Sequence, residues 1–598
     1  SFLEKLDVGW SFTPPEWMHD ICPDVVTHYN RFPSFKEREP GNLRNLPFFP
    51  TNDVAQAVCT IKIVQVVAAS INARVYLHAG SHLGAVVHGQ PIPWDDDVDL
   101  IMDYRYVRDL EIMCQGDGIE VHASGVRLRC ASAFNSLKVW LHPKGHKKMT
   151  RRTDKHYSPF VDLFAFEIDG ENVKEVFLDV NSTLKPNQSY PIKDFFPTRP
   201  YYFAGVHVLG PQAKIPESRY NLNICKMGRW NHRIERYIGN RVEGFGAELD
   251  CTYLSKRFPF RNFSTDTISI SSGNTRDELK IFPWKAATTS SMWSSLLTLE
   301  DRNTWSNIHS ESKGQDLTDN LKINEVEIDN SISLHESCIG PLKVTELNAE
   351  RGRWWMEYSK LLGDSDVIIL NEMDIGMARS DNQHTTRLLA YHLGMNYAWG
   401  LEFIELTPGD KNDRDNAFDI PDFHGLHGNA FLTKCSISDA VMFRNNIGPY
   451  FDSKPNKVNA NGFEKRLGGR MGIFGKIVVD GKETVIGSIH KLEGFQTEIK
   501  KYIGERSAII AGDQDGRYCN SIGLRNIVSG RGAKTWPASC SGFGKTRGDN
   551  ICSNMKIVVN ETTILPCVEQ FGVQVNLGDH ALTSAVLSVE NDMERVDQ

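Results

Sequence analysis

The sequence predicts two mixed α/β or α+β domains joined by a polar connector, and three observations lead to this prediction. The 598 residues exceed what one hydrophobic core usually serves. A helix followed by short apolar strands occupies residues 51–240, and strands recur at regular spacing over residues 336–598. Between them, residues 241–335 are rich in Ser, Thr, Asn and Asp, which favours a connector with few strands.

The N-terminal part of the chain begins with a segment rich in Pro and aromatic residues, and we expect an irregular arm over residues 1–50. An amphipathic helix is predicted over about 52–71. The strands predicted after it are 74–78, 98–102, 126–130, 137–141 and 160–168. A helix followed by strands in this order is typical of an α/β or α+β domain.

The C-terminal part of the chain has a more regular rhythm of strands. A helix is predicted over 354–362, between strands at 342–347 and 367–370. Later strands are predicted at 430–432, 473–479, 484–490, 508–511, 555–559 and 582–588. This spacing is typical of a strand-rich sandwich with intercalated helices.

The composition is that of a soluble globular protein, with 40% hydrophobic and 24% charged residues. The net charge of -8 argues against a dedicated polynucleotide binder, which usually carries a basic surface. The longest apolar stretch is interrupted by Gln56, Lys62 and Gln65, so no membrane-spanning segment is predicted. The chain begins at Ser1, and a removed signal peptide or membrane anchor stays an open alternative.

The cysteines and glycosylation sequons bear on the compartment in which the chain works. The 12 cysteines are even in number and scattered, without a zinc-type spacing. N-x-S/T sequons occur at Asn181, Asn187, Asn262 and Asn560. These features favour the secretory pathway (the Golgi or ER lumen, or secretion), and a cytoplasmic protein with free thiols is the alternative.

The most informative segment is YLHAGSHLGAVVHGQPIPWDDDVDL, residues 76–100. Gly80 and Ser81 follow a predicted strand, where backbone N–H groups and a hydroxyl can hold a phosphate. Asp97 and Asp99 alternate with apolar residues, and on a strand this alternation places both carboxylates on one face.

Two neighbouring carboxylates repel each other unless a cation neutralises them, and hard oxygen ligands suit Mg²⁺ or Mn²⁺. An isolated pair of this kind is usually an acidic surface turn. Here Gly80-Ser81 at a fixed interval and the flanking apolar residues favour a metal site formed by Asp97 and Asp99. Asp162 follows Val161 in another predicted strand, and we expect it to supply the third carboxylate.

These residues resemble the LicD/fukutin phosphotransferase family, which has the nucleotidyltransferase fold. The resemblance covers roughly residues 55–235. It rests on GSHLGAVVHGQPIPWDDDVDL, then Val161-Asp162-Leu163-Phe164, Asp194-Phe-Phe-Pro197, Pro216 and Gly228-Arg-Trp230. It implies a nucleotidyltransferase-like mixed sheet with helices.

The resemblance also implies an activity, namely transfer of a phospho-alcohol from a CDP-type donor to a glycan or related acceptor. Gly80 and Ser81 would bind the donor phosphates, while the three aspartates would be catalytic metal ligands. His88 is a further candidate for donor binding, although a single His is more often a structural residue. The family commonly has Arg before this His, where the chain has Val87. An Arg there would clamp a phosphate.

Polar residues also follow most of the predicted strands in the C-terminal domain. They are Asn348, Glu372, His490, Asp513, Asp515, Asp549, Asp579 and His580. Taken singly, an Asp or Asn after a strand is usually a turn residue. Because each closely follows or ends an apolar strand, we expect the set to converge at one edge of the sandwich.

The ordered set resembles the endonuclease/exonuclease/phosphatase superfamily over roughly residues 336–592. The resemblance implies a DNase-I-like four-layer α/β sandwich that hydrolyses a phosphoester or phosphodiester. Asn348 and Glu372 would hold a divalent metal and the scissile phosphate. His490 would contact the phosphate, and Asp513 would orient or activate the nucleophilic water.

The remaining members of this set surround a predicted Asp–His pair. Asp549 would fix the tautomer of His580 and stabilise its charged form. Asp579 would be a further metal ligand or would lie beside His580. The family usually has the sequence Gly-Asp-x-Asn, and this chain has Asp515 in place of that Asn. An Asn amide can donate a hydrogen bond to a phosphate, whereas an ionised carboxylate cannot. A second metal at Asp515, a different substrate and an impaired site all stay open.

The leading interpretation is a bifunctional Mg²⁺- or Mn²⁺-dependent enzyme that combines a phosphotransferase with a phosphodiesterase or phosphatase. A first alternative is a nucleic-acid-processing nucleotidyltransferase–nuclease, which the acidic net charge opposes. A second is a binding or scaffold protein with one inactive domain, favoured by Val87 and Asp515.

Overall fold

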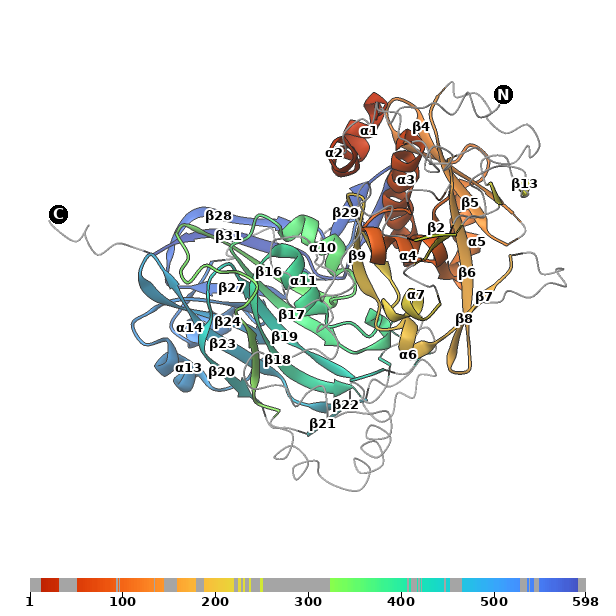
Figure 1. Cartoon of the computed structure of the whole chain (residues 1–598). Helices are drawn as coiled ribbons and strands as arrows, with labels where there is room; N and C mark the ends of the chain where they lie inside the picture. Colours follow the sequence, from red (N-terminus) through yellow and green to blue (C-terminus); the bar gives the residue numbers. More distant parts are fainter. Residues whose placement is uncertain are drawn as a thin grey trace. The chain divides into compact units, whose positions relative to one another are not determined.

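The chain divides into two compact units, which are described separately (Figure 1). Unit 1 comprises Ser1–Leu279 and Glu569–Val575, and unit 2 comprises Lys280–Val568 and Asn576–Gln598. The computed structural model describes residues 12–31, 51–92, 95, 97–133, 135–144, 159–178, 188–219, 224–226, 230–231, 236–237, 248–250, 323–405, 408–409, 413, 417, 420, 422–445, 448–451, 465–527, 535–536, 538–542 and 548–589. Most of the predicted arm and connector, and the sequons at Asn181, Asn187 and Asn262, lie outside these residues.

Unit 1 is built on a mixed sheet whose main path has the order β3-β4-β5-β6-β2-β1-β10-β9, with β7 and β8 extending from β6. Its strands are β1 (Val75–Leu77), β2 (Asp99–Asp103), β3 (Ile119–His122), β4 (Val126–Ser132), β5 (Leu137–His142), β6 (Val161–Asp169), β7 (Asn172–Val176), β8 (Ser189–Pro191), β9 (Arg199–Phe203) and β10 (Val206–Gly210). Two small ladders pair β11 (Ile224–Lys226) with β14 (Glu248–Asp250) and β12 (Trp230–Asn231) with β13 (Arg236–Tyr237). The predicted strands of this domain are all present, with ends shifted by a few residues.

The helices of unit 1 pack on this sheet. They are α1 (Glu16–Ile21), α2 (Pro23–Asn30), α3 (Thr51–Ser70), α4 (Ala79–His88), α5 (Tyr104–Cys114), α6 (Ile192–Phe195) and α7 (Lys214–Arg219). The described part of the predicted irregular arm is therefore helical, and a disulfide between Cys22 and Cys59 joins it to α3. The helix α3 is long and apolar enough to cross a membrane, but 67% of it is buried inside the unit. The predicted helix over about 52–71 is therefore present, and most of it is buried in the core of the unit.

Unit 2 contains two sheets that face each other. The first has the main order β21-β22-β18-β19-β17-β16-β31-β28, and the second has the order β20-β23-β24-β25-β27-β26. The first contains β15 (Val326–Asp329), β16 (Leu342–Arg351), β17 (Val367–Ile375), β18 (Asn396–Glu405), β19 (Leu426–Thr433), β21 (Gly448–Phe451), β22 (Lys465–Gly468), β28 (Lys556–Ile564) and β31 (Leu582–Ser588). The second contains β20 (Ser438–Arg444), β23 (Met471–Val479), β24 (Lys482–His490), β25 (Ser507–Asp513), β26 (Arg525–Asn526) and β27 (Asp549–Ser553).

Helices cover the outer faces of both sheets, which makes four layers (Figure 1). The helices α10 (Trp355–Leu362) and α11 (Thr385–Leu393) lie over the first sheet, with the short turn η5 (Ala378–Ser380) before α11. The helices α13 (Gln496–Ile503) and α14 (Arg517–Ser521) pack on the second sheet through a separate apolar cluster. A hairpin of β29 (Cys567–Gln570) and β30 (Val573–Asn576) follows β28. The predicted two-domain α/β architecture with a sandwich is therefore confirmed.

The inner faces of the two sheets in unit 2 form one apolar core, and the strands become polar at one end of it. Val344, Ile369, Ile509 and Ile551 all belong to this core. Successive side chains on a strand alternate between faces, so Asn348 in β16 and Asp513 in β25 lie on the same faces as these core residues. The candidate site of unit 2 therefore forms at the end of the core.

Five disulfides join cysteines in the described part of the chain. They are Cys22–Cys59, Cys114–Cys130, Cys338–Cys435, Cys519–Cys552 and Cys540–Cys567. One of them lies close in sequence to candidate site residues, since it joins Cys519, which follows Asp513, to Cys552, which follows Asp549. That bridge ties α14 to β27 and so joins the two segments that carry these aspartates.

Candidate active sites

The first candidate site is a group of three carboxylates in unit 1. One carboxylate oxygen each from Asp97, Asp99 and Asp162 lies within 4.8 Å of the other two, so the three residues can hold a metal ion. Asp99 and Asp162 are buried, and Asp97 is partly exposed. Negative charges this close repel one another strongly when desolvated, which is the arrangement that a divalent cation neutralises.

The backbone of two parallel strands sets the spacing of these carboxylates. Asp99 at the start of β2 lies directly opposite Asp162 in β6. The amide of Asp162 donates to the carbonyl of Val98 at 2.8 Å, which fixes the residue between Asp97 and Asp99. Val98 is fully buried, so the predicted alternation of carboxylate and apolar side chains anchors this segment.

Gly80 and Ser81 lie in the first turn of α4, directly after β1, whereas the sequence predicted only the end of a strand. The Ser81 hydroxyl accepts a hydrogen bond from the amide of Asp99 at 2.8 Å and so joins α4 to the carboxylate group. A Cβ atom on Gly80 would come within 2.8 Å of Oδ2 of Asp95 and 3.6 Å of Oδ2 of Asp99. Glycine therefore allows the helix N-terminus, with its unpaired N–H groups, to approach the carboxylates.

Asp162 has a basic partner that sequence reasoning missed. Lys138 in β5 lies directly opposite Asp162, and its ammonium donates to Oδ1 at 2.9 Å and to Oδ2 at 3.1 Å. The Ser136 hydroxyl also donates to Oδ1 of Asp162, at 2.5 Å. The sequence held one sign of this pair. Lys138 lies within an apolar strand, and a lysine that is buried there must have a partner.

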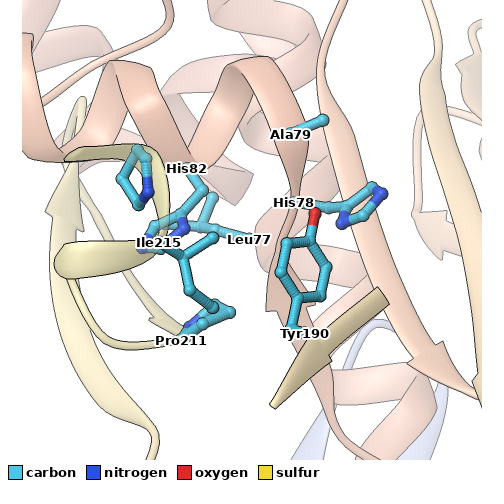
Figure 2. Close-up of a pocket in the computed structure, with 8 residues that line it drawn as sticks. Leu77, His78, Ala79, His82, Tyr190, Pro211 and Ile215 are labelled. Carbon is cyan, nitrogen blue, oxygen red and sulfur yellow. The ribbon is translucent and has the colours of Figure 1, made fainter. Parts of the chain in front are cut away.

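A small pocket opens beside the first turn of α4 (Figure 2). It is lined by Leu77, His78, Ala79, His82, Tyr190, Pro211, Ile215 and Pro216. Nε2 of His78 lies 3.3 Å from the Glu175 carboxylate, and both side chains are buried. The pocket thus adds aromatic and apolar surface next to the turn that carries Gly80.

His82 faces this pocket as a neutral imidazole. The Tyr201 hydroxyl donates to the carbonyl of Pro211 at 2.6 Å, so it accepts from Nε2–H of His82 at 3.1 Å. Burial, together with the nearby His78 and Arg199, lowers the pKa of His82 to about 3.

The structure does not bring His88 to the carboxylates. His88 is the last residue of α4, and Gly80 is in the first turn, which puts roughly 12 Å of helix between them. Val87 is only 5% exposed and packs in the interior. Neither position presents a side chain to the N-terminal turn of α4.

The second candidate site begins with Asn348 and Glu372, which the adjacent parallel strands β16 and β17 bring together. Nδ2 of Asn348 donates to Oε1 of Glu372 at 3.2 Å. Arg351 donates to the other carboxylate oxygen at 2.5 Å. Burial alone would raise the pKa of Glu372, but Arg351 and the nearby His490 hold that pKa well below its usual range. Glu372 is therefore ionised at neutral pH.

The backbone bends at this point in both strands. The pairing register shifts between Asn348 and Arg351 and between Leu370 and Met373. Glu372 has φ of 60° and Arg351 has φ of 75°, conformations that side chains other than glycine adopt rarely. These bulges turn Glu372 out of the regular ladder and toward His490, whose Nε2 lies 3.8 Å from Oε1.

His490 lies at the centre of a buried charge network. Its Nδ1 is 2.8 Å from Oε2 of Glu402, and its Nε2 is 3.5 Å from Oδ2 of Asp513. Arg470 donates to Glu402 at 2.9 Å, and Lys491 lies 3.0 Å from Asp513. Burial would raise the pKa of Asp513, but His490 and Lys491 hold it at about 2.

Sequence reasoning missed Glu402, which is fully buried in β18 and is the partner of His490. β18 was itself not predicted, although Trp399-Gly-Leu-Glu402-Phe places an acid inside an apolar run. A carboxylate in such a run must be paired, and this was the available signal. Arg351 follows Asn348 closely in the sequence, but its contact with Glu372 depends on the two bulges.

The predicted Asp–His pair is present at the start of β27, since Asp549 is the first residue of this strand. Nδ1 of His580 is 2.9 Å from Oδ2 of Asp549, which is fully buried. Burial would lower the pKa of His580, but the Asp549 carboxylate raises it to about 9, so the imidazole is charged at neutral pH. Asp579 lies at the rim, where it accepts from Nε1 of Trp536 at 2.8 Å and lies 3.7 Å from Nε2 of His580.

Gly548 connects the pair to the rest of the site. A Cβ atom there would lie 3.5 Å from Oδ1 of Asp513 and 3.5 Å from Cε1 of His580. Asp513 and His580 therefore face the same small space.

Glu350 is an acid at this edge that was not predicted, although it lies in the segment Asn348-Ala-Glu-Arg. Burial, followed by the negative charge of Asp579, raises its pKa to about 8. The structure therefore places a carboxyl group that is largely protonated at neutral pH among the ionised carboxylates of the second site.

Asp515 does not join this group in the structure. Its carboxylate accepts from the amide of Arg517 at 2.9 Å and from Nε of Arg517 at 2.9 Å. Half of the side chain is exposed, and the same residue begins the turn into α14 through its carbonyl. Asp515 forms a local ion pair at the surface, whereas the other predicted residues converge.

Comparison with known proteins identifies a family for part of unit 1. Residues 72–213 match the family described as LicD/FKTN/FKRP, nucleotidyltransferase domain. The resemblance predicted from Gly80-Ser81 and Asp97–Asp99 is thereby confirmed for this segment. A search of curated proteins finds no match.

Solved structures similar to the chain include members of the endonuclease/exonuclease/phosphatase family. A family protein from Leptotrichia buccalis is 14% identical with a TM-score of 0.27, over 41% of this chain and 99% of its own. A 3'-5' exonuclease from Neisseria meningitidis is 12% identical with a TM-score of 0.26, over 41% and 100%. The beta toxin of Staphylococcus aureus is 13% identical with a TM-score of 0.25, over 42% and 100%.

Proposed function

We propose that the chain is a bifunctional metal-dependent enzyme. Its N-terminal domain transfers a phospho-alcohol from a CDP-type donor to a glycan or related acceptor, and its C-terminal domain hydrolyses a phosphoester or phosphodiester. The observation that carries the proposal is the convergence of Asp97, Asp99 and Asp162 within the segment that matches the LicD/FKTN/FKRP family.

In the N-terminal domain, Asp97, Asp99 and Asp162 would hold Mg²⁺ or Mn²⁺, for which a set of three carboxylates is well suited. The ion would supply positive charge that stabilises the transferred phosphoryl group. The N–H groups of the first turn of α4, with Gly80 allowing close approach, would bind donor phosphate oxygens.

In the C-terminal domain, Asn348 and Glu372 would bind the divalent metal and the scissile phosphate. Asp513 is ionised and faces the same space as His580, so it can orient a water molecule for attack. His490 and His580, each paired with a buried carboxylate, would donate hydrogen bonds to phosphate oxygens as charge develops.

We further propose that the chain works in the secretory pathway or outside the cell. The support is that five disulfides join the described cysteines, and disulfides of this density persist in oxidising compartments.

The test is a donor screen on the purified chain with Mg²⁺ or Mn²⁺. CDP-choline, CDP-ribitol, CDP-glycerol and UDP-sugars are supplied with glycan acceptors, and release of the nucleoside monophosphate is followed. Bis(p-nitrophenyl) phosphate reports the hydrolytic site. We expect CMP release from at least one CDP-alcohol, and its loss in Asp99→Asn. No CMP from any donor, and no phosphodiester cleavage, would contradict the proposal.

A further inference from the structure

The structure places one lysine in direct contact with the carboxylates of unit 1. From this contact, and resting on the proposed function, we infer that Lys138 is a donor-binding residue whose ammonium contacts a phosphate of the nucleoside diphosphate. The family resemblance assigned no role to this position, and the sequence indicated only that a lysine buried in an apolar strand needs a partner.

The strand register puts Lys138 into line with the metal-binding side chains. Lys138 in β5 lies opposite Asp162 in β6, and Asp162 lies opposite Asp99 in β2. Residues directly opposite one another point to the same face of a sheet. The ammonium therefore lies on the face that carries the carboxylates, one strand beyond the proposed cation.

The ammonium is held firmly in this position. It contacts both oxygens of Asp162, and the ring of Phe160 lies 4.0 Å from the Nζ atom. The Lys138 side chain is only 8% exposed. A charge held in a desolvated position loses little entropy when it binds an anion, and its hydrogen bonds are strengthened by the low local dielectric.

The charge balance of the site also requires a further cation. Three carboxylates with one divalent ion would leave one negative charge, and the Asp95 carboxylate near Gly80 adds another, so Lys138 would offset part of the charge that repels a diphosphate. When a metal ion binds an oxygen of Asp162, the ammonium can direct one of its three protons to a phosphate oxygen on the same ion. Position 87, where the family commonly has Arg, holds a buried Val in this chain, so α4 supplies no cation there.

The alternative is that Lys138 only orients Asp162, and the two roles differ in what they predict for binding. If Lys138 only orients Asp162, its removal should weaken metal binding, and nucleotide binding should fall as a result. If it binds phosphate, its removal should weaken nucleotide binding while metal affinity stays the same or rises, since a repelling positive charge is lost.

The experiment measures Mn²⁺ binding to the metal-free chain by calorimetry, and then CDP binding to the Mn²⁺-loaded chain. The variants are Lys138→Met, Lys138→Gln and Lys138→Arg, and Asp99→Asn identifies the part of each signal that comes from the second site. Lys174→Met is the matched control, because Lys174 forms a 3.0 Å ion pair with Asp169 and contacts none of the three carboxylates. Thermal unfolding of each variant establishes whether it is folded.

We expect Lys138→Met and Lys138→Gln to bind CDP about tenfold to a hundredfold more weakly, with Mn²⁺ affinity unchanged or higher. Lys138→Arg, which keeps the charge, should recover most of the affinity, and Lys174→Met should match the wild type. If Lys138→Met does not fold, Lys138→Gln decides, because its amide still donates to Asp162.

Unchanged CDP affinity in a folded variant would overturn the inference, and so would a parallel fall in Mn²⁺ and CDP affinity. Failure of the wild-type chain to bind CDP at all would instead overturn the proposed function, and the inference with it.

Discussion

The two candidate sites use carboxylates in opposite ways. In unit 1, three carboxylates lie within 4.8 Å of one another, with Lys138 beside Asp162, and the group could hold a metal ion. In unit 2, the carboxylates are paired with bases, as in Glu372 with Arg351 and Asp549 with His580. If the proposed function is right, the carboxylates of unit 1 need a cation to offset their mutual repulsion, whereas those of unit 2 are already offset by basic side chains of the protein.

The largest effect should follow from breaking the carboxylate group of unit 1. Asp99→Asn removes one of the three carboxylates, and we expect CMP release from the active donor to fall by about a hundredfold to a thousandfold. Hydrolysis of bis(p-nitrophenyl) phosphate by unit 2 should stay at the wild-type rate. A parallel loss of both activities would show that the two sites are not independent.

The next largest effect should come from the Asp–His pair of unit 2. Asp549→Asn leaves His580 without the carboxylate that holds its charge and tautomer, so we expect phosphodiester hydrolysis to fall by about a hundredfold. Metal-dependent CMP release by unit 1 should be unaffected. A variant with full hydrolytic activity would remove the pair from the mechanism.

The contrast between the sites also explains how far the sequence could predict them. Asp97 and Asp99 are two residues apart in the chain, and the two-residue period of an extended chain is enough to place both side chains on one face. The polar residues of unit 2 could be selected because they follow strands, but their partners could not. Glu402 lies in an unpredicted strand, and its pairing with His490 spans 88 residues. Such contacts depend on strand order, which local pattern does not reveal.

The fold was predictable to a similar degree and for similar reasons. Each predicted strand carries a local apolar pattern and is present, whereas other strands, such as β10, β18 and β27, and the order of the sheets were not predicted. Asp515 shows the opposite error, because it was predicted to belong to the site and lies outside it. It stands two residues after Asp513 and was selected by its place in a family pattern, but the turn into α14 carries it to the surface.

Removing Glu402 should have an intermediate effect on both activity and stability. Glu402→Gln removes the buried carboxylate that His490 and Arg470 share, so we expect hydrolysis to fall by about tenfold to a hundredfold. Unit 2 should also lose about 3 kcal/mol of unfolding free energy. Urea unfolding followed by tryptophan fluorescence measures the second effect. An unchanged midpoint would mean that the network contributes little net stability.

A smaller effect is expected from pH on unit 1. The pKa of His82 is lowered to about 3 in the folded chain from an ordinary value of 6.5. As the pH falls, the unfolded chain therefore binds a proton on this histidine before the folded chain does. Its contribution to stability is complete above pH 6.5 and is lost as the pH falls toward 3. The expected slope is about 1.4 kcal/mol per pH unit within that window. His82→Gln should remove this slope in urea unfolding, whereas His122→Gln, at a more exposed position, should retain it.

The smallest effect should come from Asp515, the residue that distinguishes the predicted second site from the observed one. Its carboxylate is paired with Arg517 and half exposed, and exposed ion pairs contribute little to stability. Asp515→Ala should therefore change the hydrolysis rate by less than about twofold, while Asp513→Asn abolishes most of it. The contrary result would be that Asp515→Ala needs a higher Mn²⁺ concentration for half-maximal activity, or that it loses activity. Either result would mean that Asp515 leaves Arg517 and turns into the site when substrate binds. The two sites would then be more alike than the structure indicates, since both would depend on a carboxylate recruited by metal.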